Sequence, residues 1–358
     1  MDSQSNRVVA KSVCRSWLIG TLTIVFLSGC SVCGTHIVEA PFGGPFLAKT
    51  SGWSGFRKPG QAEQAKLEML EEYEPGKVPV VFIHGLLSAP GTWREMIHAL
   101  RTSPVISERF QFWVFHYPTG ASYLQSAADL RRELHQTVAH LDPFQQDHAL
   151  NNLILVGHSM GGIISKLQVT HSDDQIWRSV SNRPFSEFNA DDSTLAQVQK
   201  AMFFEPVPFV RRVIFIATPH HGSQWTERSV GRLGRRLVGF PKPVQQSYQQ
   251  LVAANLSLLN PTIESRLPTS VDHLDPDNAI LQATTRLRFV TNVRLHSIIG
   301  TGHKLPDDSD GDGVVSLQSA HIANVVSEST IPAKHTLIHR DPDTIQIVEA
   351  ALLEHLSN

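Results

Sequence analysis

Cysteine is scarce in this chain of 358 residues, and its three copies, Cys14, Cys30 and Cys33, all lie near the N-terminus. No disulfide can therefore cross-link the body of the protein. The sequence also lacks the paired cysteines of a zinc site, an internal repeat and a glycine-rich loop that cradles phosphates. The fold must therefore be stabilised by burial of apolar side chains, and we expect no bound metal.

A strong net charge is also missing. Lysine and arginine number 31 against 33 acidic residues, which gives a formal net charge of −2. Because proteins that bind nucleic acid usually present a basic surface, we expect no nucleic-acid partner. With 41% hydrophobic and 18% charged residues, the composition is that of a globular protein with one large α/β domain or two smaller ones.

The N-terminus has the pattern of an export signal. A basic leader precedes the apolar run 17–27, which is too short for a membrane span and typical of a signal peptide. The run ends in Leu27-Ser28-Gly29-Cys30, which resembles the lipobox of bacterial lipoproteins. That resemblance implies cleavage before Cys30, lipidation of its thiol and membrane anchoring, and Ser31 favours the outer membrane. A plain secretory signal or an uncleaved anchor is the alternative.

The predicted domain organisation follows from this leader. Residues 1–29 are predicted to be the signal peptide, and residues 30–60, rich in glycine and proline, a tether. Residues 61–358 are predicted to form the main domain.

Apolar runs alternate with helical patterns in the main domain. Strands are expected at 78–83, 112–115, 153–156, 213–217 and 295–299, and helices at 92–100, 121–141, 163–169 and 341–356. Nearly continuous apolar strands are typical of strands buried on both faces. The alternation therefore predicts a mainly parallel, doubly wound sheet with helices on both faces. The stretches 173–210 and 223–285 interrupt it and are interpreted as insertions that form a partly helical cap.

The motif Gly157-His158-Ser159-Met160-Gly161-Gly162 directly follows the third of these strands and precedes a helix. A serine on such a sharp turn needs glycine neighbours, because a Cβ there would collide with the strand or the helix. The turn exposes the hydroxyl at the carboxyl end of the sheet, beside the free N–H groups of the helix N-terminus. Ser159 is therefore the candidate nucleophile.

An activated serine needs a base to accept its proton and an acid to orient that base. Downstream lie Asp312-Gly313-Val314-Val315 and His335, which follows a β-like stretch and precedes the last helix. Together with His84-Gly85-Leu86 and residues 217–222 (ATPHHG), these motifs resemble the lipase and esterase branch of the α/β-hydrolase superfamily. The resemblance covers roughly residues 75–357.

The resemblance implies an α/β-hydrolase fold and a catalytic triad of Ser159, Asp312 and His335. It also implies that the backbone N–H groups of Leu86 and Met160 bind the oxyanion. The expected activity is hydrolysis of a carboxylic ester or lipid through an acyl-enzyme, with no cofactor. An acyltransferase or thioesterase acting on envelope lipids would use the same triad, and a non-catalytic lipid-binding lipoprotein would keep the fold alone.

Several site assignments have competitors in the sequence. Asp308 and Asp310 are alternatives for the acid, and His339 is the alternative base. The run of aspartates also resembles part of a calcium loop, but Ser319 stands where a bidentate Glu closes an EF-hand, so only a looser calcium site stays open.

Overall fold

The computed structural model describes residues 64–223, 240, 242–263 and 267–357. The predicted signal peptide, Cys30, the predicted tether and part of the second insertion lie outside the described residues.

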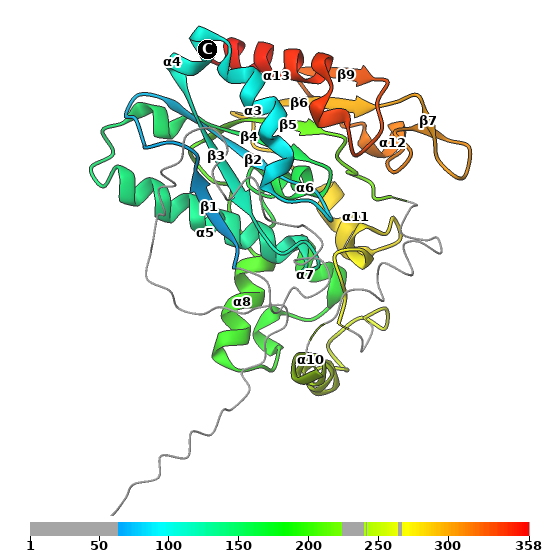
Figure 1. Cartoon of the computed structure of the whole chain (residues 1–358). Coiled ribbons are helices and arrows are strands. Elements are labelled where there is room, and N and C mark those ends of the chain that lie inside the picture. Colours follow the sequence, from blue (N-terminus) through cyan, green and yellow to red (C-terminus); the bar gives the residue numbers. More distant parts are fainter. Residues whose placement is uncertain (1–63, 224–239, 241, 264–266, 358) are drawn as a thin grey trace, which may run out of the picture.

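A sheet of seven strands, in the order β1-β3-β2-β4-β5-β6-β9, forms the centre of the fold (Figure 1). All neighbouring strands run parallel except β1 and β3, which are antiparallel. The bounds are β1 Lys66–Met69, β2 Val78–Ile83, β3 Phe110–His116, β4 Leu153–His158, β5 Val210–Ile216, β6 Arg294–Gly300 and β9 Ser327–Ile331. A separate hairpin pairs β7 (His303–Lys304) with β8 (Asp310–Gly311). The mainly parallel sheet confirms the predicted fold class, whereas β1 was not predicted.

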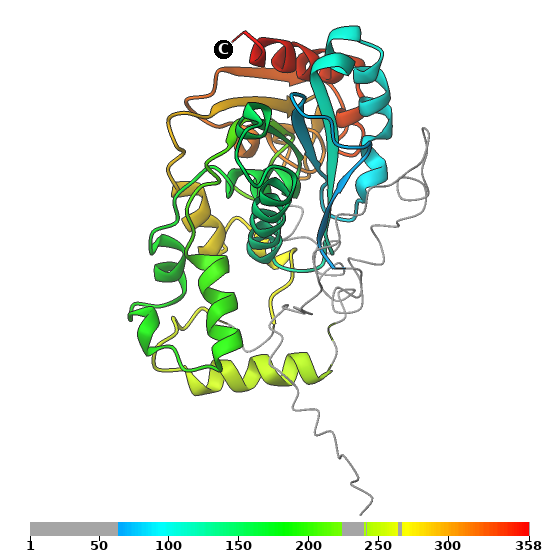
Figure 2. The same ribbon diagram turned by 90° about the vertical axis from the view of Figure 1, so that its left-hand side faces the viewer.

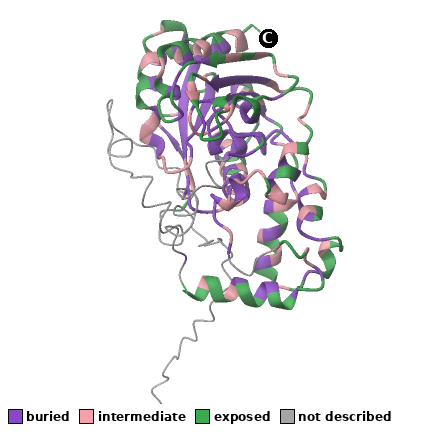
Figure 3. Ribbon diagram, turned by 90° about the vertical axis from the view of Figure 1, so that its right-hand side faces the viewer, coloured by how far each residue is buried: buried purple, intermediate pink, exposed green. Residues whose placement is uncertain are grey.

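Successive residues of the central strands enter two different hydrophobic clusters. In β2, Val81 and Ile83 belong to one cluster, and Val80 and Phe82 belong to the other. The strands β2 to β6 are almost entirely buried (Figure 3). Burial on both faces explains why the strands are apolar at consecutive positions rather than at alternate ones.

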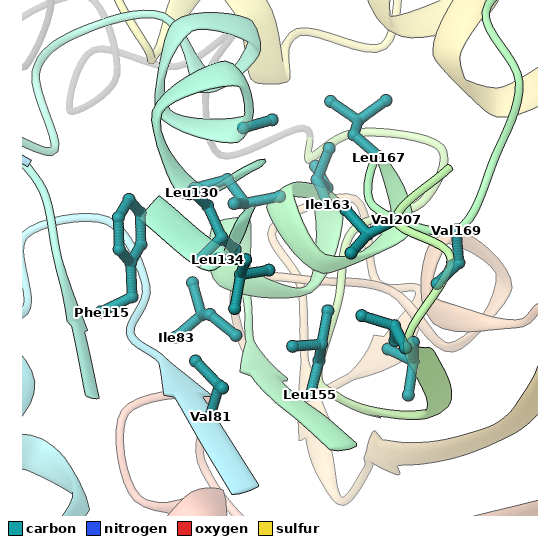
Figure 4. Close-up of a cluster of buried hydrophobic side chains, with 14 of the residues drawn as sticks. Val81, Ile83, Phe115, Leu130, Leu134, Leu155, Ile163, Leu167, Val169 and Val207 are labelled. Carbon is teal, nitrogen blue, oxygen red and sulfur yellow. The ribbon is translucent and has the colours of Figure 1, made fainter. Parts of the chain in front are cut away.

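Helices cover both faces of the sheet. The first cluster joins the sheet to α5 (Tyr123–Leu141) and α6 (Met160–Lys166), and Figure 4 shows side chains of both helices packed on β2 and β4. The second cluster joins the opposite face to α3 (Arg94–Arg101), α4 (Pro104–Arg109) and α13 (Pro342–His355). Two of these helices have side-chain N-caps: Ser122 accepts from Leu124 N–H, and Asp341 accepts from Asp343 N–H. Short 3₁₀ turns lie at Pro90–Trp93 (η1), His148–Asn151 (η2) and Ile338–Arg340 (η6).

The two insertions contain helices joined by loops where the structure describes them, and we refer to these parts as the cap. The first contains α7 (Gln175–Val180), η3 (Phe185–Glu187) and α8 (Asp192–Met202); the second contains α10 (Lys242–Ala254), η5 (Asp272–Leu274) and α11 (Ala279–Arg286). A β-bridge between Ser181 and Leu259 connects the two. In both views α10 lies at the end of the molecule opposite α13 (Figures 1 and 2).

Two small apolar clusters hold the cap together. One contains Trp177, Val198 and Leu258 and joins the two insertions, and the other contains Tyr248 of α10 and Val271. Within the described ranges, no helix has both the length and the apolar character that a membrane span requires.

Candidate active site

Ser159 occupies the turn between β4 and α6. Its φ of 54° lies in the left-handed region, which is uncommon for residues other than glycine and is often found at functional sites. Its N–H donates to Ile216 O at 2.9 Å, which ties the turn to β5. The helix begins at Met160, earlier than the predicted start at 163, because the glycines of the motif adopt helical backbone angles inside the first turn.

Two glycines of the turn are required by close packing. A Cβ on Gly161 would lie 2.2 Å from Ile83 O, and a Cβ on Gly162 would lie 1.8 Å from Thr218 Oγ1. Neither distance is sterically possible, so any side chain here would push α6 away from β2 and β5. The close approach keeps the N-terminus of α6 at the carboxyl end of the sheet.

A hydrogen-bonded chain links the serine to a histidine and a carboxylate. His335 Nε2 lies 2.9 Å from Ser159 Oγ, and His335 Nδ1 lies 2.7 Å from Asp312 Oδ2. Asp312 Oδ1 accepts hydrogen bonds from the N–H groups of Val314 and Val315 at 2.9 and 2.7 Å. Because an ionised carboxylate only accepts, the proton of a neutral His335 resides on Nδ1, and Nε2 is free to accept from the serine hydroxyl.

The three side chains are also nearly inaccessible to solvent. Ser159 is 6% exposed, Asp312 is 3% exposed and His335 is 8% exposed. His335 N–H donates to Asp312 O at 3.1 Å, so the loop that carries the histidine is attached to the loop that carries the carboxylate. A serine hydroxyl, an imidazole and a carboxylate are thus held in hydrogen-bond contact in this order, which is the arrangement that acyl transfer through a serine requires.

The alternative residues for the base and the acid, His339, Asp308 and Asp310, have other contacts or are exposed to solvent. His339 Nε2 is hydrogen-bonded to Thr92 Oγ1 at 2.6 Å. Asp310 is exposed and forms an ion pair with Lys304 at 2.9 Å, and Asp308 is exposed as well. The geometry therefore favours Asp312 and His335 over these neighbours. Among the described residues, no group of three or more His, Cys, Asp or Glu side chains is arranged to hold a metal ion.

The two expected oxyanion donors lie next to the serine. Met160 is the first residue of α6, and Leu86 follows Gly85, whose Cβ position would be 3.0 Å from Ser159 Cβ. Neither N–H donates to another described residue. Both N–H groups, that of the buried Met160 and that of the partly buried Leu86, are therefore available to a ligand oxygen beside Ser159.

Three buried histidines surround the hydrogen-bonded chain. His158 Nε2 lies 2.9 Å from His335 O, and the His158 ring packs against the rings of His335 and His339, with centroids 5.0 and 4.7 Å apart. Burial, together with the neighbouring His339 and His335, lowers the pKa of His158 well below its usual value. Burial also lowers the pKa of His84 to about 3 and that of His339 to about 4. All three rings are therefore neutral at physiological pH.

Sequence reasoning missed the residues that support the turn at Leu86. Tyr117 and Thr119 follow β3, and both contact the segment 84–87 through hydrogen bonds. Their signal in the sequence is weak: two polar residues just after the carboxyl end of a parallel strand, where such sheets place their ligands.

Comparison with known proteins identifies the family to which the chain belongs. A model of the alpha/beta hydrolase family matches residues 80–317. The match covers more than half of the chain, and the protein therefore belongs to the alpha/beta hydrolase family. A search of curated proteins gave no match.

Several solved structures resemble the chain at low sequence identity. The mature Bacillus licheniformis lipase BlEst2 is 16% identical, with 81% of this chain and 99% of that chain covered and a TM-score of 0.47. Staphylococcus hyicus lipase is 14% identical, with 80% and 96% covered and a TM-score of 0.42. An esterase from Thermogutta terrifontis is 13% identical, with 82% and 90% covered and a TM-score of 0.42.

Proposed function

We propose that the protein is a serine carboxylic-ester hydrolase of the lipase and esterase branch of its family. The observation that carries the proposal is the hydrogen-bonded chain from Asp312 through His335 to Ser159. The turn that precedes α6 supports the same chemistry, and so do the N–H groups of Leu86 and Met160, which donate to no other described residue.

In the proposed mechanism, Ser159 Oγ attacks the carbonyl carbon of an ester while His335 Nε2 accepts its proton. Asp312 keeps the other ring nitrogen protonated and stabilises the imidazolium that forms. His335 then protonates the leaving alcohol, and the acyl group remains on the serine. A water molecule attacks this acyl-enzyme by the same steps, which releases the acid and restores the free serine. No cofactor takes part.

The negative oxygen of each tetrahedral intermediate would be held by Leu86 N–H and Met160 N–H. These donors are fixed in place before the reaction, so they need no reorganisation as the charge develops. The N-terminus of α6 adds a favourable partial positive charge at the same position.

The surroundings of the oxyanion turn favour an apolar substrate. Leu86 and Leu87 pack against the cap cluster that includes Phe240, Tyr248 and Val271. An ester or lipid with an apolar acyl group would therefore enter next to a hydrophobic wall. We further propose that the mature protein starts at Cys30 and is anchored to the cell envelope, in the outer membrane, through lipid on that residue, with residues 30–60 as a tether.

The test is hydrolysis of p-nitrophenyl esters from acetate to palmitate by the full-length protein and its Ser159→Ala variant. Ser159→Ala should leave the fold intact and reduce kcat by several orders of magnitude. Ser193→Ala, at an exposed serine of α8, is the matched control and should retain full activity.

The outcomes separate the alternatives. Wild-type-like turnover by Ser159→Ala would contradict the proposal. Transfer of the acyl group to added alcohol or lysolipid in place of water would identify an acyltransferase with the same triad. Absence of both turnover and labelling by a fluorophosphonate, in folded protein, would indicate a non-catalytic lipid-binding protein.

A further inference from the structure

The turn His84–Leu87 has to be held in one position if Leu86 N–H is to face a developing oxyanion. Its backbone is not relaxed, because Leu87 has a φ of 60°, in the left-handed region. A change of about 1 Å at such a donor is enough to weaken transition-state binding substantially. The groups that fix this turn therefore matter for turnover although they never touch the substrate.

Tyr117 makes two contacts with the first residue of the turn. Its hydroxyl donates to His84 O at 2.6 Å, and its ring stacks on the His84 ring with centroids 4.4 Å apart and an interplanar angle of 10°. The other side of the ring lies against Phe115, with centroids 5.6 Å apart. Tyr117 is 1% exposed, and burial raises the pKa of its hydroxyl well above the usual value, so it remains a donor at all working pH values.

The His84 side chain depends on this stacking. Its Nδ1 lies 3.1 Å from the adjacent Gly85 O, and its Nε2 is buried without a hydrogen-bond partner among the described residues. Because the ring is neutral, no ion pair fixes it either. The Tyr117 hydroxyl, which donates to the His84 carbonyl, is thus a polar restraint on His84 from outside the turn.

A second residue of the same loop holds the far side of the turn. Leu87 N–H donates to Thr119 Oγ1 at 3.3 Å, and Thr119 is buried. The loop follows β3, which pairs with β2 in a register that places Ile83 beside Phe115. The strand pairing therefore delivers Tyr117 and Thr119 to the two ends of the turn that carries Leu86.

We infer that Tyr117 is a positioning residue of the oxyanion site, which with Thr119 clamps the His84–Leu87 turn so that Leu86 N–H points at the reacting carbonyl. The inference rests on the proposed ester hydrolysis. In it, Tyr117 does not touch the substrate and acts only by holding the backbone of the His84–Leu87 turn. The donor is needed in the transition state and not in the bound ester, so the clamp affects kcat and not KM.

The test is Tyr117→Phe, which removes only the hydroxyl and keeps the stacked ring. Loss of a complete oxyanion donor costs about 10²–10³-fold in kcat. Loosening one donor should therefore reduce kcat by roughly tenfold, with KM within about twofold of wild type. Affinity for an aryl trifluoromethyl ketone, which forms a tetrahedral adduct on the serine, should fall by the same factor as kcat.

Tyr123→Phe is the matched control. Tyr123 is equally buried, but its hydroxyl lies 3.3 Å from Thr284 Oγ1, so this variant should keep wild-type kcat and inhibitor affinity. Thr119→Val removes the hydroxyl that accepts from Leu87 N–H with little change of side-chain shape, and it should also lower kcat. If Tyr117→Phe does not fold, as judged by thermal unfolding, Thr119→Val decides the question.

Unchanged kcat in folded Tyr117→Phe would overturn the inference, and so would a rise in KM alone, which would indicate substrate binding instead. Ser159→Ala is measured alongside. Turnover that depends on Ser159 but not on Tyr117 would refute the clamp and leave the ester hydrolase standing, whereas turnover independent of Ser159 would refute the proposed function itself.

Discussion

The two ends of the central sheet both bury titratable side chains, but they do so in different ways. At the amino end, Arg212 of β5 and His296 of β6 meet Glu354 and His355 of α13. At the carboxyl end, His84 and His158 lie around the hydrogen-bonded chain at Ser159. Comparing the two ends separates groups that secure the fold from groups that orient the chemistry.

Charged side chains pair with one another at the amino end. Arg212 is fully buried and bonds to His296, to Glu354 at 3.2 Å and to His355 at 3.3 Å. Arg294 also forms an ion pair with Glu354. These contacts join the C-terminal part of α13 to β5 and β6, so their removal should affect stability.

Backbone groups orient the side chains at the carboxyl end. Asp312 is held by two N–H groups, His158 lies against His335 O, and Tyr117 donates to His84 O. Burial keeps His84 and His158 neutral there, and the N–H groups of Leu86 and Met160 donate to no other described residue. Changes at this end should therefore affect turnover more than stability.

The largest expected effect is that of Asp312→Asn at the carboxyl end. The amide cannot keep His335 in the tautomer that accepts the serine proton, so kcat should fall by about 10³–10⁴-fold. Asp310→Asn is the control, because Asp310 is exposed and paired with Lys304, and it should retain activity. Ester turnover of the two variants is the measurement. A larger loss in Asp310→Asn would show that the acid was assigned to the wrong residue.

At the amino end, Arg212→Ala should lower the free energy of unfolding by about 3 kcal/mol, because it leaves a cavity and breaks a buried hydrogen-bonded network. The kcat of the remaining folded protein should be unchanged. Arg211→Ala, at a partly exposed neighbour whose side chain donates to Pro208 O, should change stability by less than about 0.5 kcal/mol. Urea unfolding and turnover measured on both variants test the separation of the two ends. If Arg212→Ala lost as much turnover as Asp312→Asn, the two ends of the sheet would not have separate roles.

The smallest expected effect is a dependence of the free energy of unfolding on pH, to which buried histidines at both ends of the sheet should contribute. Burial lowers the pKa of His339 at one end, and of His296 and His355 at the other, to about 4. In the unfolded chain these histidines take up protons below about pH 6.5, so the unfolded state binds more protons than the native state between pH 6.5 and 4. Stability should therefore fall as the pH decreases through this window, by at most about 1.4 kcal/mol per pH unit for each fully buried histidine.

His296→Gln should reduce this pH dependence without affecting the pH dependence of kcat. Urea unfolding at pH 7 and pH 5 for wild type and His296→Gln gives the comparison. Equal stability of the wild type at both pH values would contradict the assignment of neutral, buried histidines.

The sequence predicted the central strands well because their physical signal is local. The expected strand 78–83 coincides with β2, whose consecutive apolar residues are buried on both faces. By contrast, β1 has lysine and glutamate in a four-residue strand, and β9, at the other edge, is mostly polar, so both depend on pairing with a neighbour. Residues 66–69 carry no pattern that distinguishes a strand from a loop.

The same distinction applies to the candidate site. Ser159, Asp312 and His335 lie in motifs with a recognisable order, and the structure places the three side chains within hydrogen-bond distance of one another, while their catalytic roles stay a prediction. The contact of Tyr117 with His84 arises from the pairing of β3 with β2, and no spacing in the sequence encodes it. The position of α10 likewise depends on how the cap folds back over the turn at Leu86.

The most direct test of the central claim is to label the full-length protein with a fluorophosphonate and to map the modified residue by mass spectrometry. We expect stoichiometric labelling of Ser159 alone, with parallel loss of ester turnover and no labelling of Ser159→Ala. Labelling of another serine, or full turnover by protein that is labelled at Ser159, would contradict it.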